Sequence, residues 1–202
     1  MLNFDFHNPT RIAFGQGRIA DLDKLVPAAA KVLILVGGAS AEKTGTLAEV
    51  RTALGSRQHA TFTGIEPNPS YETSMNAVAQ IREGGFDFLL AVGGGSAIDA
   101  TKAILIALWQ NATSIEDLDL YRAGKPKEGA APPSEAIRPS SDAIRMLAVP
   151  TTLSAAEFNA FAGITDSRYG IKESFGHRLV VPRVIVLDPA ATLATPMDLM
   201  LS

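Results

Sequence analysis

The sequence has no cysteine among its 202 residues, which excludes disulfides and metal sites built from thiolates. It also has no apolar run that approaches the roughly 20 residues needed to span a bilayer. The opening residues, MLNFDFHNP, include an aspartate and lack the apolar core of a signal peptide. We therefore expect a soluble, cytoplasmic protein without a membrane partner.

Clusters of like charge are missing as well. The chain has 18 basic and 21 acidic side chains and a formal net charge of −3, with no basic block along its length. This balance argues against a nucleic acid as partner. Apolar residues are plentiful: they make up 47% of the chain, which is enough for the core of one domain and the start of a second.

The most informative stretch is FDFLLAVGGGSAIDATK, from Phe86 to Lys102. Its apolar residues 88–92 do not alternate with polar ones, which is typical of a strand buried on both faces of a parallel sheet. Three glycines end this strand and allow a sharp turn, and Ser96 is expected to cap a helix over 97–109. Because the start of a helix attracts anions, this order predicts a cradle for the pyrophosphate of a nucleotide.

Two polar residues, Asp99 and Lys102, follow the glycines on one face of the expected helix. Their place beside the cradle would let them support a bound nucleotide. The alternative is a carboxylate that stabilises the start of the helix and a lysine exposed to solvent. The pattern alone leaves both interpretations open.

A second glycine pattern, Gly15 to Ala20, fits the G-x-G-x-x-A form of the dinucleotide fingerprint. We interpret it as coincidental, because it follows an expected edge strand or β-hairpin over Phe4 to Phe14 rather than a buried strand. In a true fingerprint, an acidic residue also lies at the end of the next strand. The next strand, expected over 32–36, has none.

That strand ends in Gly37, Gly38, Ala39 and Ser40. Without a carboxylate at its end, this loop leaves space for a 2′-phosphate, which favours NADP over NAD. The alternative is an ordinary loop before a helix that we expect over residues 42–54.

Asn68 lies between two prolines in the turn 64–70, and Ser70 is expected to cap a helix over 71–83. The amide of Asn68 is suited to bind the ribose or the adenine of a nucleotide. An asparagine that only shapes the turn is the commoner explanation.

The second half begins with a long surface excursion, residues 110–142, that contains one short helix near 115–121. The sheet resumes at 146–149 and ends in Thr151 and Thr152, where α/β proteins place ligand contacts. A β-hairpin is expected over 158–165 and 169–175, with Lys172 near a phosphate or in solvent. Residues 180–187 predict another buried strand, and the lone His177 is expected to be structural rather than a metal ligand.

Six motifs keep a shared order across nearly the whole length: RIAFGQG (11–17), VGGASAEKTG (36–45), GIEPNPSYETSMNAV (64–78), AVGGGSAIDATK (91–102), PTT (150–152) and VIVLDP (184–189). With them the sequence resembles the iron-containing, or group III, alcohol dehydrogenases. The first half is most similar to the NADPH-dependent aldehyde reductase and butanol dehydrogenase branch. The short segment PTTLSAAE, Pro150 to Glu157, is instead similar to the maleylacetate reductases.

The resemblance implies an α/β fold with a Rossmann-like, mostly parallel sheet, helices on both faces and an N-terminal β-hairpin. Residues 1–189 would form the NAD(P)-binding domain. Residues 190–202 would begin the linker into the family's helical domain, which holds Fe²⁺ or Zn²⁺ and whose ligands are absent from this chain. The implied cofactor-binding residues are Gly37, Gly38, Ser40 and Asn68 at the adenosine end, Gly94, Gly95 and Ser96 at the pyrophosphate, Asp99 and Lys102 beside that turn, Thr151 and Thr152 at the inner part of the cofactor, and Lys172 at its phosphates or ribose.

The family's activity is hydride transfer between NAD(P)H and an alcohol or aldehyde whose oxygen the metal polarises. The resemblance therefore implies an oxidoreductase, a homodimer in the family's manner, of which this chain supplies the cofactor-binding half. Alone, the chain is expected to bind NAD(P) weakly or partly and not to turn over. The alternatives are a maleylacetate-reductase-like enzyme and a stand-alone nucleotide-binding module without catalysis.

Overall fold

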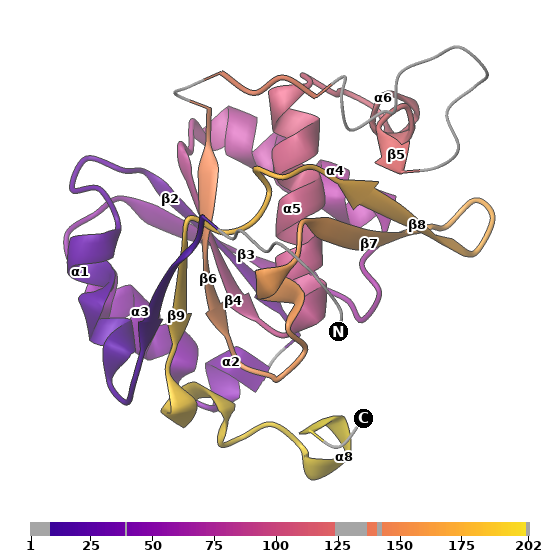
Figure 1. The fold of residues 1–202 in the computed structure, drawn as a ribbon. Coiled ribbons are helices and arrows are strands. Elements are labelled where there is room, and N and C mark those ends of the chain that lie inside the picture. Colours follow the sequence, from indigo (N-terminus) through magenta and orange to yellow (C-terminus); the bar gives the residue numbers. More distant parts are fainter. Residues whose placement is uncertain (1–8, 39, 124–136, 141–142, 201–202) are drawn as a thin grey trace, which may run out of the picture.

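The computed structural model describes residues 9–38, 40–123, 137–140 and 143–200. At its centre is a six-stranded sheet in the order β1-β9-β6-β4-β2-β3, in which all neighbours are parallel (Figure 1). The strands are β1 (Arg11–Phe14), β2 (Val32–Gly37), β3 (His59–Ile65), β4 (Phe88–Gly93), β6 (Arg145–Pro150) and β9 (Val184–Leu187). The predicted Rossmann-like α/β class is confirmed.

Helices cover both faces of this sheet (Figure 1). Successive residues of a strand point to opposite faces, so Val32 and Ile34 pack with one apolar cluster, whereas Leu33 and Leu35 pack with another. The first cluster includes η1 (Arg18–Asp21), α1 (Leu22–Leu25) and α3 (Thr46–Leu54). The second includes α4 (Tyr71–Gly84) and α5 (Gly95–Trp109), whose residues 97–107 are buried except for Asp99. The central strands β2 and β4 are therefore apolar on both faces, as their sequences predicted.

A smaller antiparallel sheet in the order β5-β8-β7 projects from the side of the domain beside α5 (Figure 1). Its hairpin, β7 (Phe161–Asp166) and β8 (Ile171–Gly176), confirms the one expected from the sequence. The short strand β5 (Arg122–Ala123) pairs with β8 and follows α6 (Ile115–Asp119), which confirms the predicted short helix. The rest of the expected excursion falls largely on residues 124–136 and 141–142, outside the described residues.

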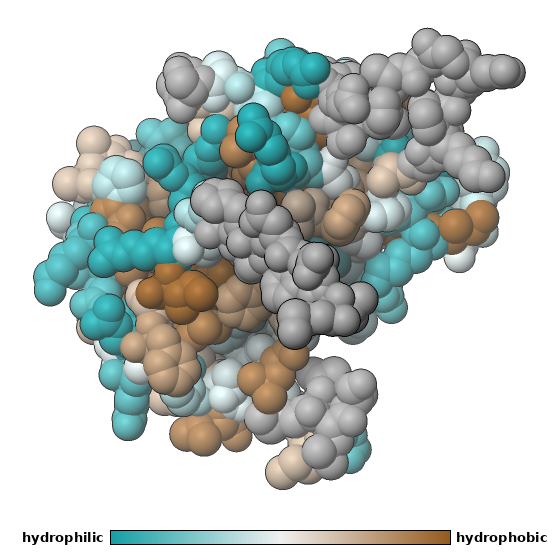
Figure 2. Space-filling view, in the orientation of Figure 1, coloured by the Kyte–Doolittle hydropathy of each residue, from teal (hydrophilic) through white to brown (hydrophobic). Residues whose placement is uncertain are grey.

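One edge of the main sheet is β1, whose parallel pairing with β9 confirms the expected edge strand. The first arm of the alternative N-terminal hairpin would fall on residues 1–8, which lie outside the described part of the chain. Ile12 and Phe14 on this strand are 53% and 71% exposed. Figure 2 shows hydrophobic residues gathered on this side of the molecule, over the region where β1 and β9 lie in Figure 1.

Two predicted elements are shorter than expected. The helix expected over 42–54 is two helices, α2 (Ser40–Lys43) and α3, because Gly45 between them has a φ of +82°. The strand expected over 180–187 begins at Val184, because Pro182 has no N–H to give to the sheet. The chain continues through η3 (Pro189–Thr192) to α8 (Met197–Met200). None of the described helices is long and apolar enough to cross a membrane.

Candidate functional site

The carboxyl ends of β2, β4 and β6 open into a cleft of about 860 Å³. Parallel strands of an open α/β sheet end at a common edge, so the loops that follow them surround one space. The walls are the turn after β4, the loop after β6 and the near side of the β7–β8 hairpin. The cleft is lined by many of the residues predicted to bind a cofactor: Gly37, Gly38, Gly94, Gly95, Ser96, Asp99, Thr151, Thr152 and Lys172.

The glycine turn after β4 forms the floor of this cleft. Gly93 has a φ of +150°, and Gly94 is the extended residue that precedes α5, with φ −82° and ψ −170°. The helix therefore begins at Gly95, and no side chain of the described residues caps it. The prediction that Ser96 is the cap is wrong, because Ser96 already lies within the first helical turn. The uncapped N-terminus leaves N–H groups and the positive end of the helix dipole at the cleft.

Close packing explains why these positions are glycine. A Cβ added to Gly94 would lie 3.0 Å from Cγ2 of Thr152, and one added to Gly95 would lie 3.1 Å from Oγ of Ser154. The loop after β6 therefore passes directly against the turn. Side chains here would close the narrow space in which a ligand phosphate would reach the backbone N–H groups.

Lys102 does not point into the cleft. Its side chain is fully buried, and Nζ donates hydrogen bonds to the carbonyl oxygens of Ala156 (2.6 Å) and Phe161 (2.6 Å) and to Oδ1 of Asn159 (3.2 Å). Burial lowers the pKa of Lys102, and the carboxylate of Asp99 partly opposes that shift. The interpretation as a solvated lysine is wrong, and the contacts join α5 to the loop after β6.

Asp99 lies at the edge of the same contact. Its Oδ1 is 3.5 Å from Nζ of Lys102, and its Oδ2 accepts a 3.0 Å hydrogen bond from the backbone N–H of Gly163 on β7. Asp99 also lines the cleft. It therefore fixes the hairpin to the start of α5 while one side of its carboxylate faces the space that a ligand would fill.

Asn68 and Lys172 meet at the mouth of the cleft. The backbone of Asn68 has a φ of +56°, the left-handed conformation that the turn between the two prolines requires. Its Oδ1 accepts a 3.1 Å hydrogen bond from Nζ of Lys172, which lies on β8 and lines the cleft. The turn and the hairpin thus place the exposed ammonium of Lys172 at the opening of the cleft. Its acceptor, Asn68, lies 104 residues earlier in the sequence.

The loop after β6 supplies residues that the sequence did not predict. Ser154, Ala156 and Asn159 line the cleft together with Thr151 and Thr152. The backbone N–H of Thr151 donates to the carbonyl oxygen of Gly93 at 2.9 Å, which continues the pairing of β6 with β4 past the last strand residue. Only their position just after a buried strand marks these residues in the sequence.

At the end of β2, Gly37 and Gly38 line the cleft, and no carboxylate of the described residues follows this strand before Glu42. Ser40 begins α2, and its side chain is not described. The pattern Gly15 to Ala20 does not line the cleft; the N–H of Ile19 instead donates to Oδ2 of Asp188 at 3.3 Å. A dinucleotide fits the site at its glycine cradle and by the volume of the cleft.

A metal centre is not found in the same space. The described residues contain no group of three histidine, cysteine, aspartate or glutamate side chains that would hold a metal ion. They therefore do not fit an iron site, and none of them is assigned as an iron ligand.

These features define an α/β domain with a cleft at a glycine turn, and the sequence matches the family model of the iron-containing alcohol dehydrogenases over residues 9–189. The chain belongs to this family. It is 43% identical over 200 residues to the NADPH-dependent aldehyde reductase YqhD of Escherichia coli K12, covering 97% of this chain and 48% of the relative. The chain thus spans about half the length of the curated relatives that it matches.

Solved structures agree with the fold. The substrate- and cofactor-free form of the E. coli aldehyde reductase YqhD superposes with a TM-score of 0.80 at 40% identity, covering 98% of this chain and 47% of that one. An NADH-dependent butanol dehydrogenase from Thermotoga maritima gives a TM-score of 0.79 at 28% identity, with the same coverage of 98% and 47%. The expected similarity to the aldehyde reductase and butanol dehydrogenase branch is confirmed.

Proposed function

We propose that this chain binds NADP(H) in the cleft at the glycine turn and acts as the cofactor-binding half of an alcohol dehydrogenase or aldehyde reductase. The observation that supports this most directly is the uncapped N-terminus of α5 against a glycine turn too crowded for side chains. Such a turn offers N–H groups to a pyrophosphate. The aldehyde reductase relative is named as NADPH-dependent, and the butanol dehydrogenases of Bacillus subtilis as NADH-dependent.

Each part of the cleft has a role in this proposal. Gly94, Gly95 and Ser96 bind the pyrophosphate through the start of α5, and Lys172 adds a positive charge at the mouth. The small residues Gly37 and Gly38 leave space for the 2′-phosphate of NADP. When bound, the dinucleotide supplies or accepts the hydride. The chain's own residues hold and orient it.

Further parts of the proposal concern the whole protein. A homodimer, a domain boundary near residue 189 and an alcohol or aldehyde substrate follow from the family resemblance. A cytoplasmic location is the expectation from the opening residues and the hydropathy of the sequence. We do not propose a nucleic acid partner, because the net charge of the chain is −3. The maleylacetate-reductase-like alternative stays a prediction that depends on the short segment 150–157.

Calorimetric titration of this chain with NADPH and with NADH tests the proposal. The parent chain is expected to bind NADPH at least tenfold more tightly than NADH. Gly95→Val is expected to abolish binding, because the added carbons would meet Ser154. Ala48→Val adds two of the same three carbons at an exposed position of α3 and is expected to bind as the parent does. NADPH binding that survives in a folded Gly95→Val variant, or no binding in the parent, would overturn the proposal.

A further inference from the structure

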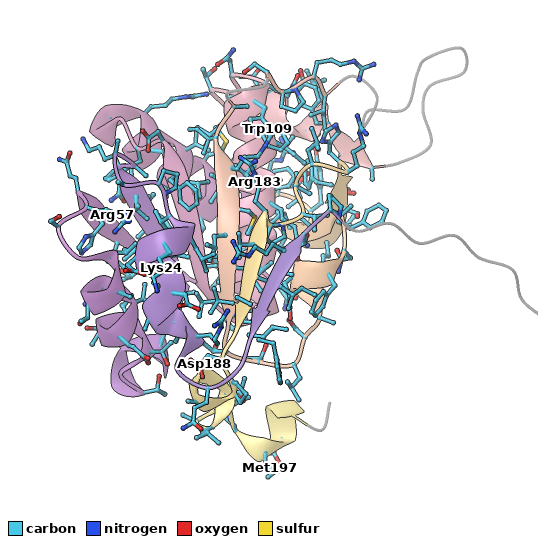
Figure 3. The ribbon with its side chains drawn as sticks, turned by 60° about the vertical axis from the view of Figure 1, so that its left-hand side comes forward. Lys24, Arg57, Trp109, Arg183, Asp188 and Met197 are labelled. Atoms are coloured by element: carbon cyan, nitrogen blue, oxygen red, sulfur yellow. The ribbon has the colours of Figure 1, made fainter. Side chains whose placement is uncertain are left out.

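A cluster of arginine side chains lies at the end of the main sheet opposite the dinucleotide cleft. Arg145 begins β6, and Arg183 directly precedes β9, the parallel neighbour of β6. In Figure 3, Arg183 and Trp109 are labelled toward this end of the sheet and Asp188 at the other. Strand β6 has 6 residues, so roughly 20 Å separates the cluster from the cleft. The arginine cluster consists of Arg138, Arg145, Arg178 and Arg183.

Two aromatic rings, those of Trp109 and His177, form the centre of this cluster. They meet edge to face with their centroids 5.8 Å apart, and the guanidinium carbon of Arg145 lies 5.0 Å from the centroid of the Trp109 ring. Nε1 of Trp109 donates a 2.9 Å hydrogen bond to the carbonyl oxygen of Ile144, which fixes the indole beside the start of β6. The indole therefore holds the guanidinium of Arg145 by a cation–π contact.

The positive charges of the cluster are not balanced within the described part of the chain. None of the four arginines forms an ion pair with a carboxylate there, and Nη1 of Arg145 is buried without a hydrogen-bond partner. Burial lowers the pKa of Arg145, and the charge of Arg183 lowers it further. Burial also lowers the pKa of His177, and three arginine charges add to this shift: those of Arg178, Arg145 and Arg138. Three arginines elsewhere do pair with carboxylates: Arg51, Arg122 and Arg168.

The hydrogen-bond donors of the cluster suit an oxyanion. A guanidinium presents its N–H groups in one plane and can pair with two oxygens of a phosphate at once. Nδ1 of His177 accepts a 3.2 Å hydrogen bond from the N–H of Leu179, so the neutral ring carries its proton on Nε2 and offers one more donor. Arg183 is exposed, so a ligand can reach the cluster from solvent. A phosphate group brings about two negative charges, which offset more of the repulsion between the arginines than a carboxylate would.

We propose that the arginine cluster binds a phosphate group through the guanidinium groups of Arg145 and Arg183 and through Nε2 of His177. The group is inorganic phosphate or the phosphate of a small ester. This site is independent of the proposed function, because it lies at the other end of the sheet. The competing occupant is a carboxylate of this chain from outside the described residues, and Asp142, three residues before Arg145, is the nearest in sequence.

Titration of this chain with inorganic phosphate at constant ionic strength tests the inference. Trp109, the only tryptophan of the sequence, supplies the readout, and its indole N–H signal in NMR is expected to shift and saturate. Arg145→Gln and Arg183→Gln are each expected to weaken binding about tenfold, the effect of one lost hydrogen bond to a charged group. Arg82→Gln, at an exposed arginine of α4, is the matched control and is expected to bind as the parent does.

Further arms of the experiment identify the site and the source of the phosphate. Gly95→Val blocks the glycine turn and is expected to leave the phosphate shift of Trp109 unchanged. Bound phosphate is also expected to raise the pKa of His177, followed by NMR with His59 as the internal reference. Glycerol 3-phosphate replaces inorganic phosphate in a parallel titration. Tighter binding of the ester assigns the site to a phosphorylated small molecule, and equal or weaker binding assigns it to the free ion.

Three results would overturn the inference: no saturable shift of Trp109, equal affinity in the parent and in both arginine variants, or a shift that Gly95→Val abolishes. Phosphate binding that is seen only in Asp142→Asn would overturn it as well, because the chain's own carboxylate would then occupy the arginines. If one arginine variant does not fold, the other variant and the titration of His177 decide the question. NADPH binding is measured separately, so the proposed function can fail without this inference, and the reverse.

Discussion

Nζ of Lys102 donates a 2.6 Å hydrogen bond to the carbonyl oxygen of Ala156, and this bond joins α5 to the loop after β6. A second bond of 2.6 Å reaches the carbonyl oxygen of Phe161, where β7 begins. The cleft at the glycine turn and a second cavity, at the carboxyl ends of β1, β6 and β9, both border this loop at Thr152 and Leu153. One buried ammonium therefore fixes the wall between two spaces.

Lys102→Met is expected to destabilise the chain strongly. The methionine fills much of the volume but removes the ammonium from the carbonyl oxygens of Ala156 and Phe161, and it leaves Oδ1 of Asn159 with only the N–H of Phe161 as donor, at a cost of about 3 to 5 kcal/mol. Urea unfolding measures this loss, and Lys24→Met, an exposed lysine labelled in Figure 3, is the control. We also expect weaker NADPH binding, because the loop is no longer held. A variant with parent stability would show that the contacts contribute nothing.

Lys172→Met is expected to weaken NADPH binding about tenfold with little effect on stability. Nζ of Lys172 is held at the mouth of the cleft by Oδ1 of Asn68, 3.1 Å away, and its charge faces the space where the phosphates are expected. Losing one cation also reduces the dependence of binding on salt. Calorimetry at two salt concentrations measures both effects. Equal affinity and equal salt dependence in the parent and variant would remove Lys172 from the site.

His177→Gln is expected to reduce the sensitivity of the fold to acid. Burial lowers the pKa of His177, and the positive charges of Arg178, Arg145 and Arg138 lower it further. Nδ1 accepts a 3.2 Å hydrogen bond from the N–H of Leu179, which a protonated ring cannot do.

The sign of this effect follows from proton binding. The unfolded chain protonates the histidine at a higher pH than the folded chain does, so stability falls as the pH drops below about 6.5. Thermal unfolding between neutral pH and pH 5 measures the slope, with His59→Gln as control. A variant as acid-sensitive as the parent would contradict the assignment.

Ser70→Ala is expected to destabilise the chain by about 1 kcal/mol. Oγ of Ser70 accepts a 3.2 Å hydrogen bond from the backbone N–H of Thr73 and thereby caps α4. The same change at Ser114, the cap of the short helix α6, tests whether the effect grows with the packing of the helix. Denaturant unfolding measures the loss of stability in both variants. The slope of the unfolding free energy against denaturant concentration is expected to stay unchanged. No loss at Ser70 would mean that Glu66, which accepts from the N–H of Ser70, holds the helix start alone.

Local patterns were sufficient to predict β1, β2, β4, β6 and β9, α4 with its cap, the hairpin and the cleft, whereas β3 and β5 were not predicted. The apolar run 88–92 before three glycines is compatible with few structures other than a buried strand that ends in a turn. A proline after a polar turn marks the start of α4 clearly. The position of the α5 cap was predicted wrongly because three successive glycines impose no preference on where the helix begins. Pro182 likewise shortened β9 inside an otherwise continuous apolar run.

Long-range contacts were beyond the reach of these patterns. The acceptors of Lys102 are main-chain carbonyls 54 and 59 residues further on, and nothing in their side chains marks them. Ser154 and Asn159 line the cleft only because the loop after β6 lies against the glycine turn, where Lys102 holds it. A lysine that binds a phosphate and a lysine that hydrogen-bonds to a loop can have the same local sequence. The sequence alone therefore could not distinguish these two roles for Lys102.

The pairing of β1 with β9 has a consequence for synthesis. Oγ1 of Thr10, just before β1, donates to the carbonyl oxygen of Pro182, 172 residues later, and no other described strand pairs with β1. On a ribosome that adds about 5 to 20 residues per second, β1 waits on the order of ten to thirty seconds for its neighbour. Throughout that time the apolar residues Ile12 and Phe14 have no sheet to join. The nascent chain is therefore open to aggregation, and to help from a chaperone, at β1, the first of its described strands.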